Sequence, residues 1–469
     1  MNTRTAIANI KKSTEPKLLC ASFNQDQNCF AIGYENGFRV YNTDPMVLRV
    51  KRNFNKSNGK HKNLSRIGNI TMLHRTNFLA LVGGGKNPKF PINKVIIYDD
   101  LKKKNSLILE FMSPILNVFL SRIRIVIVVE THIYVYAFSS PPKKIASYET
   151  IENPFGIADL SNSLSTTSTN DNNINNNNHN TNNNNTNNNT NNNTNNTTSN
   201  RHRSYAPSTT ANEILAFPGR QPGQIQIVDI SPVGQERNLI SIIKAHKSKI
   251  RCLALNKLGT MVASASETGT IIRIHSTQNC TLLYEFRRGL DRAIVYSMKF
   301  SPNGSKLAVI SDKQTLHIFN IFNSNSLSKS SIMGNHFLNN SNHSLSSNSN
   351  SINDNPISSK SLTYNRSHML KNMPFFSSYF NSTWSFTKLI PNIDKYNDGL
   401  NYNNTIIDRG VFGWSGEDSV IIVWKFRGKW EKYVIVEKEK KKSEDHKDSN
   451  IREWELVREG WRSFGDLND

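Results

Sequence analysis

Short apolar runs recur along the chain in pairs, and each pair predicts a β-hairpin. The second run of a pair is alternating or fully apolar, which is typical of strands in a half-buried or fully buried sheet. This second run is found in seven copies: Phe38–Tyr41, Val95–Tyr98, Ile133–Tyr136, Ile225–Val228, Ile271–Ile274, Leu316–Phe319 and Ile421–Trp424.

The first run precedes the second by a few residues, and turn residues such as Glu35-Asn36-Gly37 separate the two. The first runs are Phe30–Gly33, Phe78–Val82, Ile125–Val129, Ile214–Phe217, Met261–Ser264, Leu307–Ile310 and Val411–Trp414. Uninterrupted units repeat every 38–46 residues or so, about the period of a four-stranded propeller blade. The repeat therefore predicts an all-β protein with one seven-bladed β-propeller over residues 14–469. Its blades are degenerate, WD40-like ones, since the usual Gly-His and Trp-Asp marks are mostly absent.

Three stretches interrupt the period. Residues 43–65 predict a basic, polar loop. Residues 161–212 are rich in Ser and Thr and then in Asn, with almost no apolar side chain to offset the entropy of ordering. They predict a disordered insertion between the outer strands of the fourth blade. Residues 323–381 predict an insertion within the sixth blade.

The end of this third insertion, Met369–Phe380, concentrates Met, Phe and Tyr beside Lys371. One interpretation is a membrane-facing loop, because aromatic rings favour the headgroup level of a bilayer. The other is that these residues begin the inner strand of the next blade and pack in the core. Both remain open for Tyr379 and Phe380, whereas the loop is favoured from Met369 to Phe376. The residues expected to enter the bilayer interface are Met369, Leu370, Phe375 and Phe376.

Composition narrows the possible partners. The chain has 469 residues, 36% of them hydrophobic, a net charge of +22 and a pI near 9.7. Such a charge favours an anionic partner, either nucleic acid or a membrane surface. No apolar run approaches the roughly 20 residues that a membrane span needs, and the first twelve residues lack the apolar core of a signal peptide. Any membrane contact is therefore expected to be peripheral.

The chain carries no pattern typical of an enzyme. Its four cysteines form no Cys-x-x-Cys pair, so no zinc site or disulfide framework is predicted and reduced thiols are expected. Gly83-Gly84-Gly85-Lys86 lacks the upstream Gly and the following Ser or Thr of a phosphate-binding loop. Neither a Gly-x-Ser-x-Gly elbow nor His-rich metal spacing is present. The sequence therefore predicts no catalytic residue, no metal and no cofactor.

Phe286-Arg287-Arg288-Gly289 carries the most specific chemistry in the chain. Neighbouring side chains of a strand point to opposite faces, so the two arginines would serve two separate anion sites. The planar guanidinium of Arg matches phosphate oxygens with two parallel hydrogen bonds. The alternative for an isolated pair is two solvated surface arginines.

At the end of the fifth of seven degenerate blades, this motif resembles that of the PROPPIN family. These WD-repeat proteins, also called WIPI proteins, bind phosphoinositides in autophagy. Further segments that resemble the family are His246–Arg251, Ala263–Arg273, Tyr296–Pro302, Lys89–Asp100, Trp414–Asp418 and Trp454–Trp461. The second-blade segment and the closing segment resemble the shorter-tailed branch of the family. The resemblance covers all seven blades and leaves out the low-complexity insertions.

The resemblance implies two pockets on the rim of blades five and six, for phosphatidylinositol 3-phosphate and phosphatidylinositol 3,5-bisphosphate. Carried over by motif, the first pocket uses Arg287 with His246, Ser266, Thr270 and Arg273. Hydroxyls donate to phosphate oxygens and arginines supply charge. Arg273 also interrupts an otherwise apolar strand, where an unpaired charge is costly. An intramolecular carboxylate is therefore the alternative partner for Arg273.

The second pocket implied by the resemblance uses Arg288 with Ser297 and Ser311. The family tends to place a basic residue near the start of the inner strand of the seventh blade. The expected position holds Thr383, with Arg292 or His317 as candidates to compensate.

Two classes of function remain. The favoured one is a non-enzymatic phosphoinositide-binding membrane adaptor in autophagy and protein transport. It would be cytoplasmic, peripheral on preautophagosomal, endosomal or vacuolar membranes, and would recruit an autophagy protein partner. The alternative is a WD-repeat scaffold or nucleic-acid-binding propeller without lipid binding. RNA readers interleave aromatic and basic residues, whereas hydroxyl residues surround the arginine pair here, so no nucleic-acid partner is expected.

Overall fold

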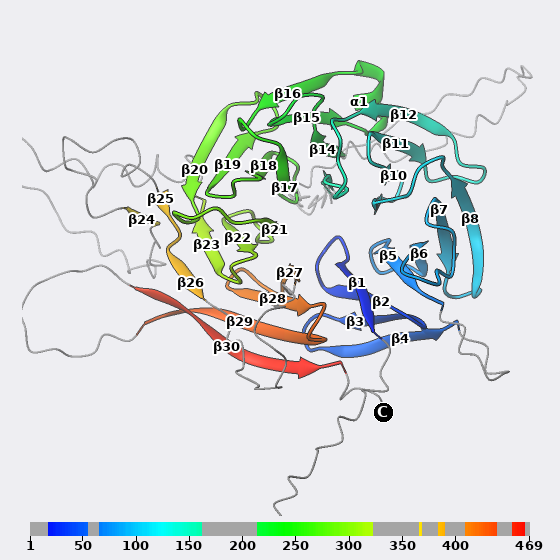
Figure 1. Cartoon of the computed structure of the whole chain (residues 1–469), viewed down its shortest axis with the longest axis horizontal. Coiled ribbons are helices and arrows are strands. Elements are labelled where there is room, and N and C mark those ends of the chain that lie inside the picture. The colour runs from blue at the N-terminus through cyan, green and yellow to red at the C-terminus, as the bar shows by residue number, and fades with distance from the viewer. Residues whose placement is uncertain are drawn as a thin grey trace, which may run out of the picture.

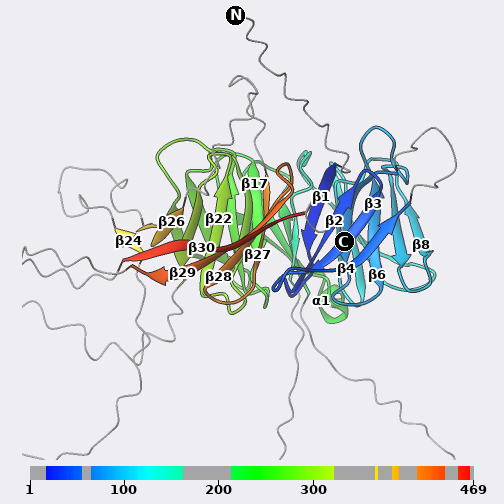
Figure 2. The ribbon, with the colours of Figure 1, turned by 90° about the horizontal axis from the view of Figure 1, so that it is seen from below.

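The computed structural model describes residues 17–54, 65–161, 213–321, 365–367, 383–389, 409–438 and 453–464. These residues form seven β-sheets arranged as blades around a central axis (Figure 1). The ring is a disc when it is seen from its edge (Figure 2). The seven-bladed β-propeller predicted from the repeat is confirmed.

Each blade has its first strand at the axis and its fourth at the rim. Blades 1 to 3 contain β1 (Leu18–Phe23), β2 (Cys29–Tyr34), β3 (Gly37–Asn42), β4 (Val47–Asn53); β5 (Ile67–Met72), β6 (Phe78–Gly83), β7 (Lys94–Asp99), β8 (Lys104–Glu110); and β9 (Asn117–Leu120), β10 (Arg124–Val128), β11 (His132–Ala137), β12 (Lys144–Glu149). Blades 4 and 5 contain β13 (Asp159–Leu160), β14 (Ile214–Pro218), β15 (Gln224–Asp229), β16 (Ile240–Lys244); and β17 (Ile250–Leu255), β18 (Met261–Ser266), β19 (Ile271–Ser276), β20 (Leu282–Arg287).

Blades 6 and 7 contain β21 (Val295–Phe300), β22 (Lys306–Ser311), β23 (Leu316–Asn320), β26 (Thr387–Leu389); and β27 (Gly410–Trp414), β28 (Ser419–Trp424), β29 (Lys429–Glu437), β30 (Trp454–Ser463). Between β15 and β16 lies the short helix α1 (Pro232–Arg237), whose first turn is capped by the Ser231 hydroxyl. No helix in the described part of the chain is both long and apolar enough to cross a membrane.

The runs predicted from the sequence are the second and third strands of every blade. These strands are buried on both faces because the neighbouring blades cover them, and all six residues of β2 are buried. The rim strands alternate between exposed and partly buried residues, as β4 does. The prediction of a loop over 43–65 was wrong where Val47–Asn53 forms β4, since one solvated face makes a rim strand look polar.

The hydrophobic core lies between the blades. Phe286 of blade 5 stacks on Phe319 of blade 6, with ring centroids 4.8 Å apart. Blade 1 and blade 7 meet through Phe30, Tyr41 and Trp430, all buried. Blade 7 consists of β27–β30 alone and blade 1 of β1–β4, so this packing closes the ring without a shared sheet.

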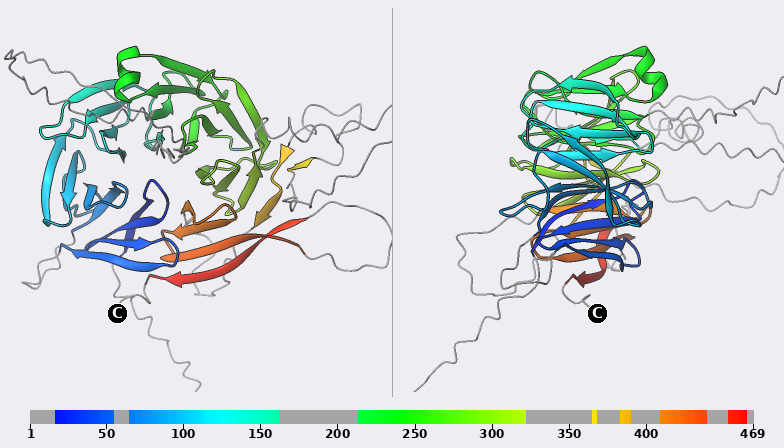
Figure 3. Two further views of the ribbon diagram at one scale, coloured as in Figure 1. Left: turned by 180° about the vertical axis from the view of Figure 1, so that it is seen from behind. Right: turned by 90° about the vertical axis from the view of Figure 1, so that its right-hand side faces the viewer.

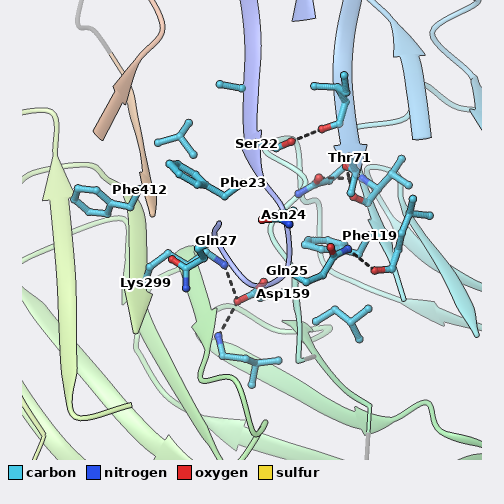
Figure 4. A pocket seen from close by; sticks show the side chains of 18 of the residues that line it. Ser22, Phe23, Asn24, Gln25, Gln27, Thr71, Phe119, Asp159, Lys299 and Phe412 are labelled. Carbon is cyan, nitrogen blue, oxygen red and sulfur yellow. Dashed lines mark hydrogen bonds and ion pairs between the residues drawn. The ribbon is translucent and has the colours of Figure 1, made fainter. Parts of the chain in front are cut away.

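A cavity of about 500 Å³ occupies the centre of the ring, lined by the inner strands (Figure 4). Its polar side chains connect one blade with the next. The hydroxyl of Ser22 donates to the carbonyl of Ile70 at 2.6 Å, and that of Thr71 to Val118 at 2.9 Å. The carboxylate of Asp159 accepts a hydrogen bond from the backbone N–H of Leu255 at 2.8 Å. These groups hold the inner strands together, which makes the cavity part of the scaffold.

The insertion of the fourth blade leaves β13 and returns at β14. It therefore joins the innermost and second strands of the blade, and the prediction that it lies between the outer strands was wrong. With only two residues, β13 is too short to show a period in the sequence. Residues 162–212, for which disorder was predicted, lie outside the described residues.

The insertion of the sixth blade joins β23, which ends at Asn320, to β26, which begins at Thr387. Two described pieces of it lie against the rim: β25 (Thr383–Trp384) pairs in parallel with β20, and β24 (Arg366–Ser367) pairs with β25. Seen from behind, these two short yellow strands lie outside the ring (Figure 3). The side-chain amide of Asn365 bonds the backbone N–H and carbonyl of Asn320 at 2.8 and 2.7 Å.

The structure corrects two predictions about this insertion. Thr383 lies beside Phe286 on the rim of blade 5, not at the inner strand of blade 7, which begins at Gly410. The interpretation that Met369–Phe380 begins that inner strand is wrong for the same reason. The four residues expected to insert into a membrane, Met369, Leu370, Phe375 and Phe376, lie outside the described residues.

Candidate functional site

Arg287 and Arg288 lie on opposite faces of blade 5. Arg287 ends β20 and pairs in register with Ile271, while Phe286 packs toward blade 6. Strand alternation therefore directs Arg287 toward blade 4 and the next side chain toward blade 6. The position of Arg288 is consistent with this direction, because the negative charge of Asp312 in blade 6 raises the pKa of the Arg288 guanidinium. This geometry agrees with the deduction that the two side chains face apart.

The boundary between blades 4 and 5, where the first pocket is predicted and which is called groove A here, collects most of the residues predicted for that pocket. Ser266, Arg273 and Arg287 share the face of blade 5 that is turned toward blade 4, and Thr270 stands just before β19. His246 enters from the connection between β16 and β17, and its Nε2 lies 3.0 Å from the hydroxyl of Ser264. The hydroxyl of Ser266 lies 2.8 Å from that of Thr268. The structure thus brings Ser266, Arg273, Arg287 and His246 together. Thr270 stands opposite Arg288, whose backbone N–H donates to its carbonyl, so strand alternation places Thr270 on the other face of blade 5.

Within groove A, Arg273 has an intramolecular carboxylate partner, the alternative left open by the sequence. Its Nε lies 2.8 Å from Oε2 of Glu285, the residue opposite it on β20. Its Nη1 donates to the backbone carbonyl of Ala245. Burial, reinforced by the Arg273 charge, lowers the pKa of His246 to about 4, so its imidazole is neutral at pH 7. A neutral imidazole offers one donor and one acceptor.

The boundary between blades 5 and 6, where the second pocket is predicted and which is called groove B here, contains Arg288. Its Nε donates to the carbonyl of Gly269 at 2.7 Å and its Nη2 to that of Asp291 at 2.6 Å. Burial lowers the pKa of Arg288, partly offset by Asp312 and Asp291. His317 faces the same groove, and burial followed by the Arg288 charge lowers its pKa to about 4.

Ser311 supplies an unsatisfied polar atom in the wall of groove B. It shares a face with Val295, which packs toward blade 5, and its side chain is fully buried. Its hydroxyl has no hydrogen-bond partner among the described residues. A buried hydroxyl without a partner is costly, so a ligand that reaches it gains a hydrogen bond.

Ser297 does not join the other residues predicted for the second pocket. It pairs in register with Ile310, which packs in the core between blades 6 and 7. A β-bulge between Val295 and Ser297 shifts the alternation of β21 by one residue, so Ser297 lies on the face away from Arg288. A bulge cannot be seen in the period of the sequence.

The structure adds residues that sequence reasoning missed. Groove A gains Ser264 and Glu285. Groove B gains Thr315, whose hydroxyl lies 3.2 Å from Nε2 of His317, and Lys388, which pairs in register with His317. Lys388 is thus a basic side chain on the same face of blade 6 as His317. Because β26 has only three residues and follows a long insertion, spacing along the sequence could not locate it.

Within the described ranges, no group of three or more His, Cys, Asp or Glu side chains is placed to hold a metal ion. What the two grooves offer is cationic and hydroxyl groups with neutral imidazoles. This combination suits a phosphorylated, hydroxyl-rich ligand.

Comparisons with known proteins agree with this geometry. A sequence model of the PROPPIN family matches residues 195–365, which include both arginines and both grooves up to Ser311 and His317. The curated "SVP1-like protein 2" of Debaryomyces hansenii is 53% identical, with all of both chains covered. The chain belongs to the PROPPIN family. The curated "SVP1-like protein 2" of Saccharomyces cerevisiae is 38% identical, with 98% of each chain covered.

Solved structures share the fold of this PROPPIN. Hsv2 of Kluyveromyces lactis superposes with a TM-score of 0.60 at 23% identity, over 96% of this chain and 99% of that one. A complex of KlAtg21 with the coiled coil of AgAtg16 gives a TM-score of 0.55 at 17% identity, with 96% and 99% covered. Membership places the chain in a family of phosphoinositide-binding propellers of autophagy.

Proposed function

We propose that this PROPPIN is a non-enzymatic membrane adaptor that reads phosphatidylinositol 3-phosphate and phosphatidylinositol 3,5-bisphosphate through grooves A and B. The observation that carries the proposal is the pair Arg287 and Arg288, which one strand end delivers to two separate grooves. Each groove combines arginine with hydroxyl groups and a histidine that is neutral at pH 7.

The chemistry of groove A suits an inositol headgroup. The guanidinium groups of Arg287 and Arg273 match phosphate oxygens, which accept two parallel hydrogen bonds from one Arg. Ser264 and Ser266 supply hydroxyls that both donate and accept. The neutral His246 can accept a hydrogen bond from a ring hydroxyl, which an imidazolium cannot do.

Groove B offers a different set of groups. Arg288 is buried, and the lower effective dielectric constant there strengthens its attraction for an anion. Ser311, Thr315 and Lys388 supply two hydroxyls and a second cation. Ser297 lies on the other face of β21, and we leave it out of this groove.

Two independent grooves predict a stoichiometry of two for a soluble headgroup such as inositol 1,3-bisphosphate. Arg287→Ala should remove groove A alone and Arg288→Ala groove B alone, so each variant should bind close to one headgroup per chain. Titration calorimetry measures this, with Arg220→Ala as the control because Arg220 is an exposed arginine outside both grooves. A stoichiometry that stays the same in both groove variants would refute the two-site proposal.

We further propose that the sixth-blade insertion adds membrane contact. The chain leaves β24 after Ser367 and returns at Thr383, so the segment between them starts and ends at the rim where β20 delivers Arg287 (Figure 1). Met369, Leu370, Phe375 and Phe376 belong to that segment. Apolar burial at about 25 cal/mol per Å² would add affinity for a bilayer without changing headgroup recognition.

Replacing residues 368–382 with a short Gly-Ser linker should therefore weaken binding to liposomes containing phosphatidylinositol 3-phosphate while sparing binding of the soluble headgroup. Sedimentation and calorimetry measure the two quantities. Deleting residues 170–200 of the Asn-rich tract is the control and should change neither. An equal loss for headgroup and liposome would mean that the segment shapes the groove and does not contact the membrane.

The same proposal includes a cytoplasmic protein, peripheral on preautophagosomal, endosomal or vacuolar membranes, that recruits an autophagy protein. The KlAtg21 complex supports a coiled coil as the first partner to test. The alternative function is a WD-repeat scaffold or nucleic-acid-binding propeller without lipid binding. Sedimentation with liposomes that contain or lack phosphatidylinositol 3-phosphate separates the two, since only the adaptor responds to the lipid.

A further inference from the structure

A carboxylate stands inside groove A, where the proposed ligand is an anion. Glu285 lies two residues before Arg287 on β20 and is the direct cross-strand neighbour of Arg273. Its Oε2 lies 2.8 Å from Nε of Arg273. Both side chains are partly exposed, 44% for Glu285 and 29% for Arg273, so solvent and solutes reach the pair.

The ion pair engages N–H groups of Arg273 that would otherwise donate to a phosphate. Nε of Arg273 is engaged by Glu285 and Nη1 by the carbonyl of Ala245. A phosphate that binds Arg273 through a two-bonded fork must displace the carboxylate, and one that binds beside it meets a like charge. Side chains at i and i+2 of a strand share one face and stand about 7 Å apart, so this charge also acts on an anion held by Arg287.

We propose that Glu285 is a specificity-determining residue of groove A, which competes with the ligand phosphate for Arg273. A small anion that contacts Arg273 alone gains too little to displace the carboxylate. A headgroup that also engages Arg287, Ser266 and His246 gains enough. The cost of displacing the carboxylate is the same for every anion that binds Arg273, so Glu285 brings simple anions such as inorganic phosphate below measurable affinity while the headgroup still binds. This inference rests on the proposed headgroup function of groove A.

The test is Glu285→Gln, which keeps the shape and one acceptor oxygen for Arg273 but removes the charge. We expect affinity for soluble inositol 1,3-bisphosphate to rise about three- to tenfold at low salt, because an exposed ion pair is weak and screened. Affinity for inorganic phosphate should rise by a similar factor, so that binding too weak to measure in the wild type becomes measurable. A merely structural glutamate would not increase affinity when replaced.

A matched control exists on blade 2. Lys94 and Glu110 are also cross-strand neighbours on the outer two strands, 3.0 Å apart and partly exposed. Glu110→Gln removes the same charge far from groove A and should leave both affinities unchanged. The gain in Glu285→Gln should shrink in the background Arg273→Gln, because competition requires that arginine and only the weaker through-space effect of the charge on an anion held by Arg287 remains.

The outcomes separate the two hypotheses. Wild-type binding that depends on Arg287 but does not increase in Glu285→Gln would overturn the competition and leave the proposed function intact. A gain that is undiminished without Arg273, or that Glu110→Gln reproduces, would also overturn it, because competition for Arg273 would then not be the cause. Absence of headgroup binding in both wild type and Glu285→Gln would overturn the proposed function itself.

Discussion

Replacing Arg287 and Arg288 together with Thr is expected to abolish sedimentation with liposomes that contain phosphatidylinositol 3-phosphate. Each groove loses the arginine that defines it. A hydrogen bond to a charged group contributes roughly 1.5–3 kcal/mol, so losing several lowers affinity by two or more orders of magnitude. Because both grooves on one chain bind one membrane, the loss in avidity exceeds the loss at either site alone.

The control for this double variant is Lys143→Thr with Lys144→Thr, an adjacent and exposed basic pair on blade 3 whose loss changes the net charge equally. Arg288 also bonds the carbonyls of Gly269 and Asp291, so thermal unfolding must show that the double variant still folds. A folded double variant that sediments as the control does would refute the assignment of both grooves.

Glu431→Ala is expected to destabilise the propeller by about 3–5 kcal/mol, the usual result of breaking a buried charge network. Glu431 is 2% exposed, and its Oε2 accepts hydrogen bonds from Nε1 of Trp424 at 2.6 Å and the hydroxyl of Tyr433 at 2.8 Å. Arg458 lies 3.3 Å from its Oε1. Without the carboxylate, these donors and the Arg charge would remain unsatisfied between the outer strands of blade 7.

Chemical denaturation measures the loss of unfolding free energy in Glu431→Ala. Glu431→Gln should lose less, because an amide oxygen still accepts from Trp424 or Tyr433. Glu459→Ala is the surface control: Glu459 pairs with Lys432 at 2.8 Å but is 54% exposed, where such pairs contribute little. Equal stability of Glu431→Ala and Glu459→Ala would show that the buried network does not support the blade.

The blade count could be predicted because the middle strands of a propeller are buried on both faces. That burial requires continuous apolar runs, and the same requirement recurs in every blade. The rim strands have no such requirement, so the sequence predicts a loop where the structure has β4. Strands of two or three residues, such as β13 and β26, carry no readable period, so their places within blades 4 and 6 came only from the structure.

For the two grooves, too, the sequence determined one part of the arrangement and the tertiary structure decided the rest. That Arg287 and Arg288 face apart follows from the two-residue period of a strand, and the sequence by itself determined it. The sequence also determined the seven blades and, through its resemblance to a family, most residues of groove A. Which residues meet across strands depends on register, and register is set by pairing and bulges that leave no local signal. Only the tertiary structure therefore decided that Glu285 faces Arg273, that Lys388 lies beside His317, and that Ser297 turns away from Arg288.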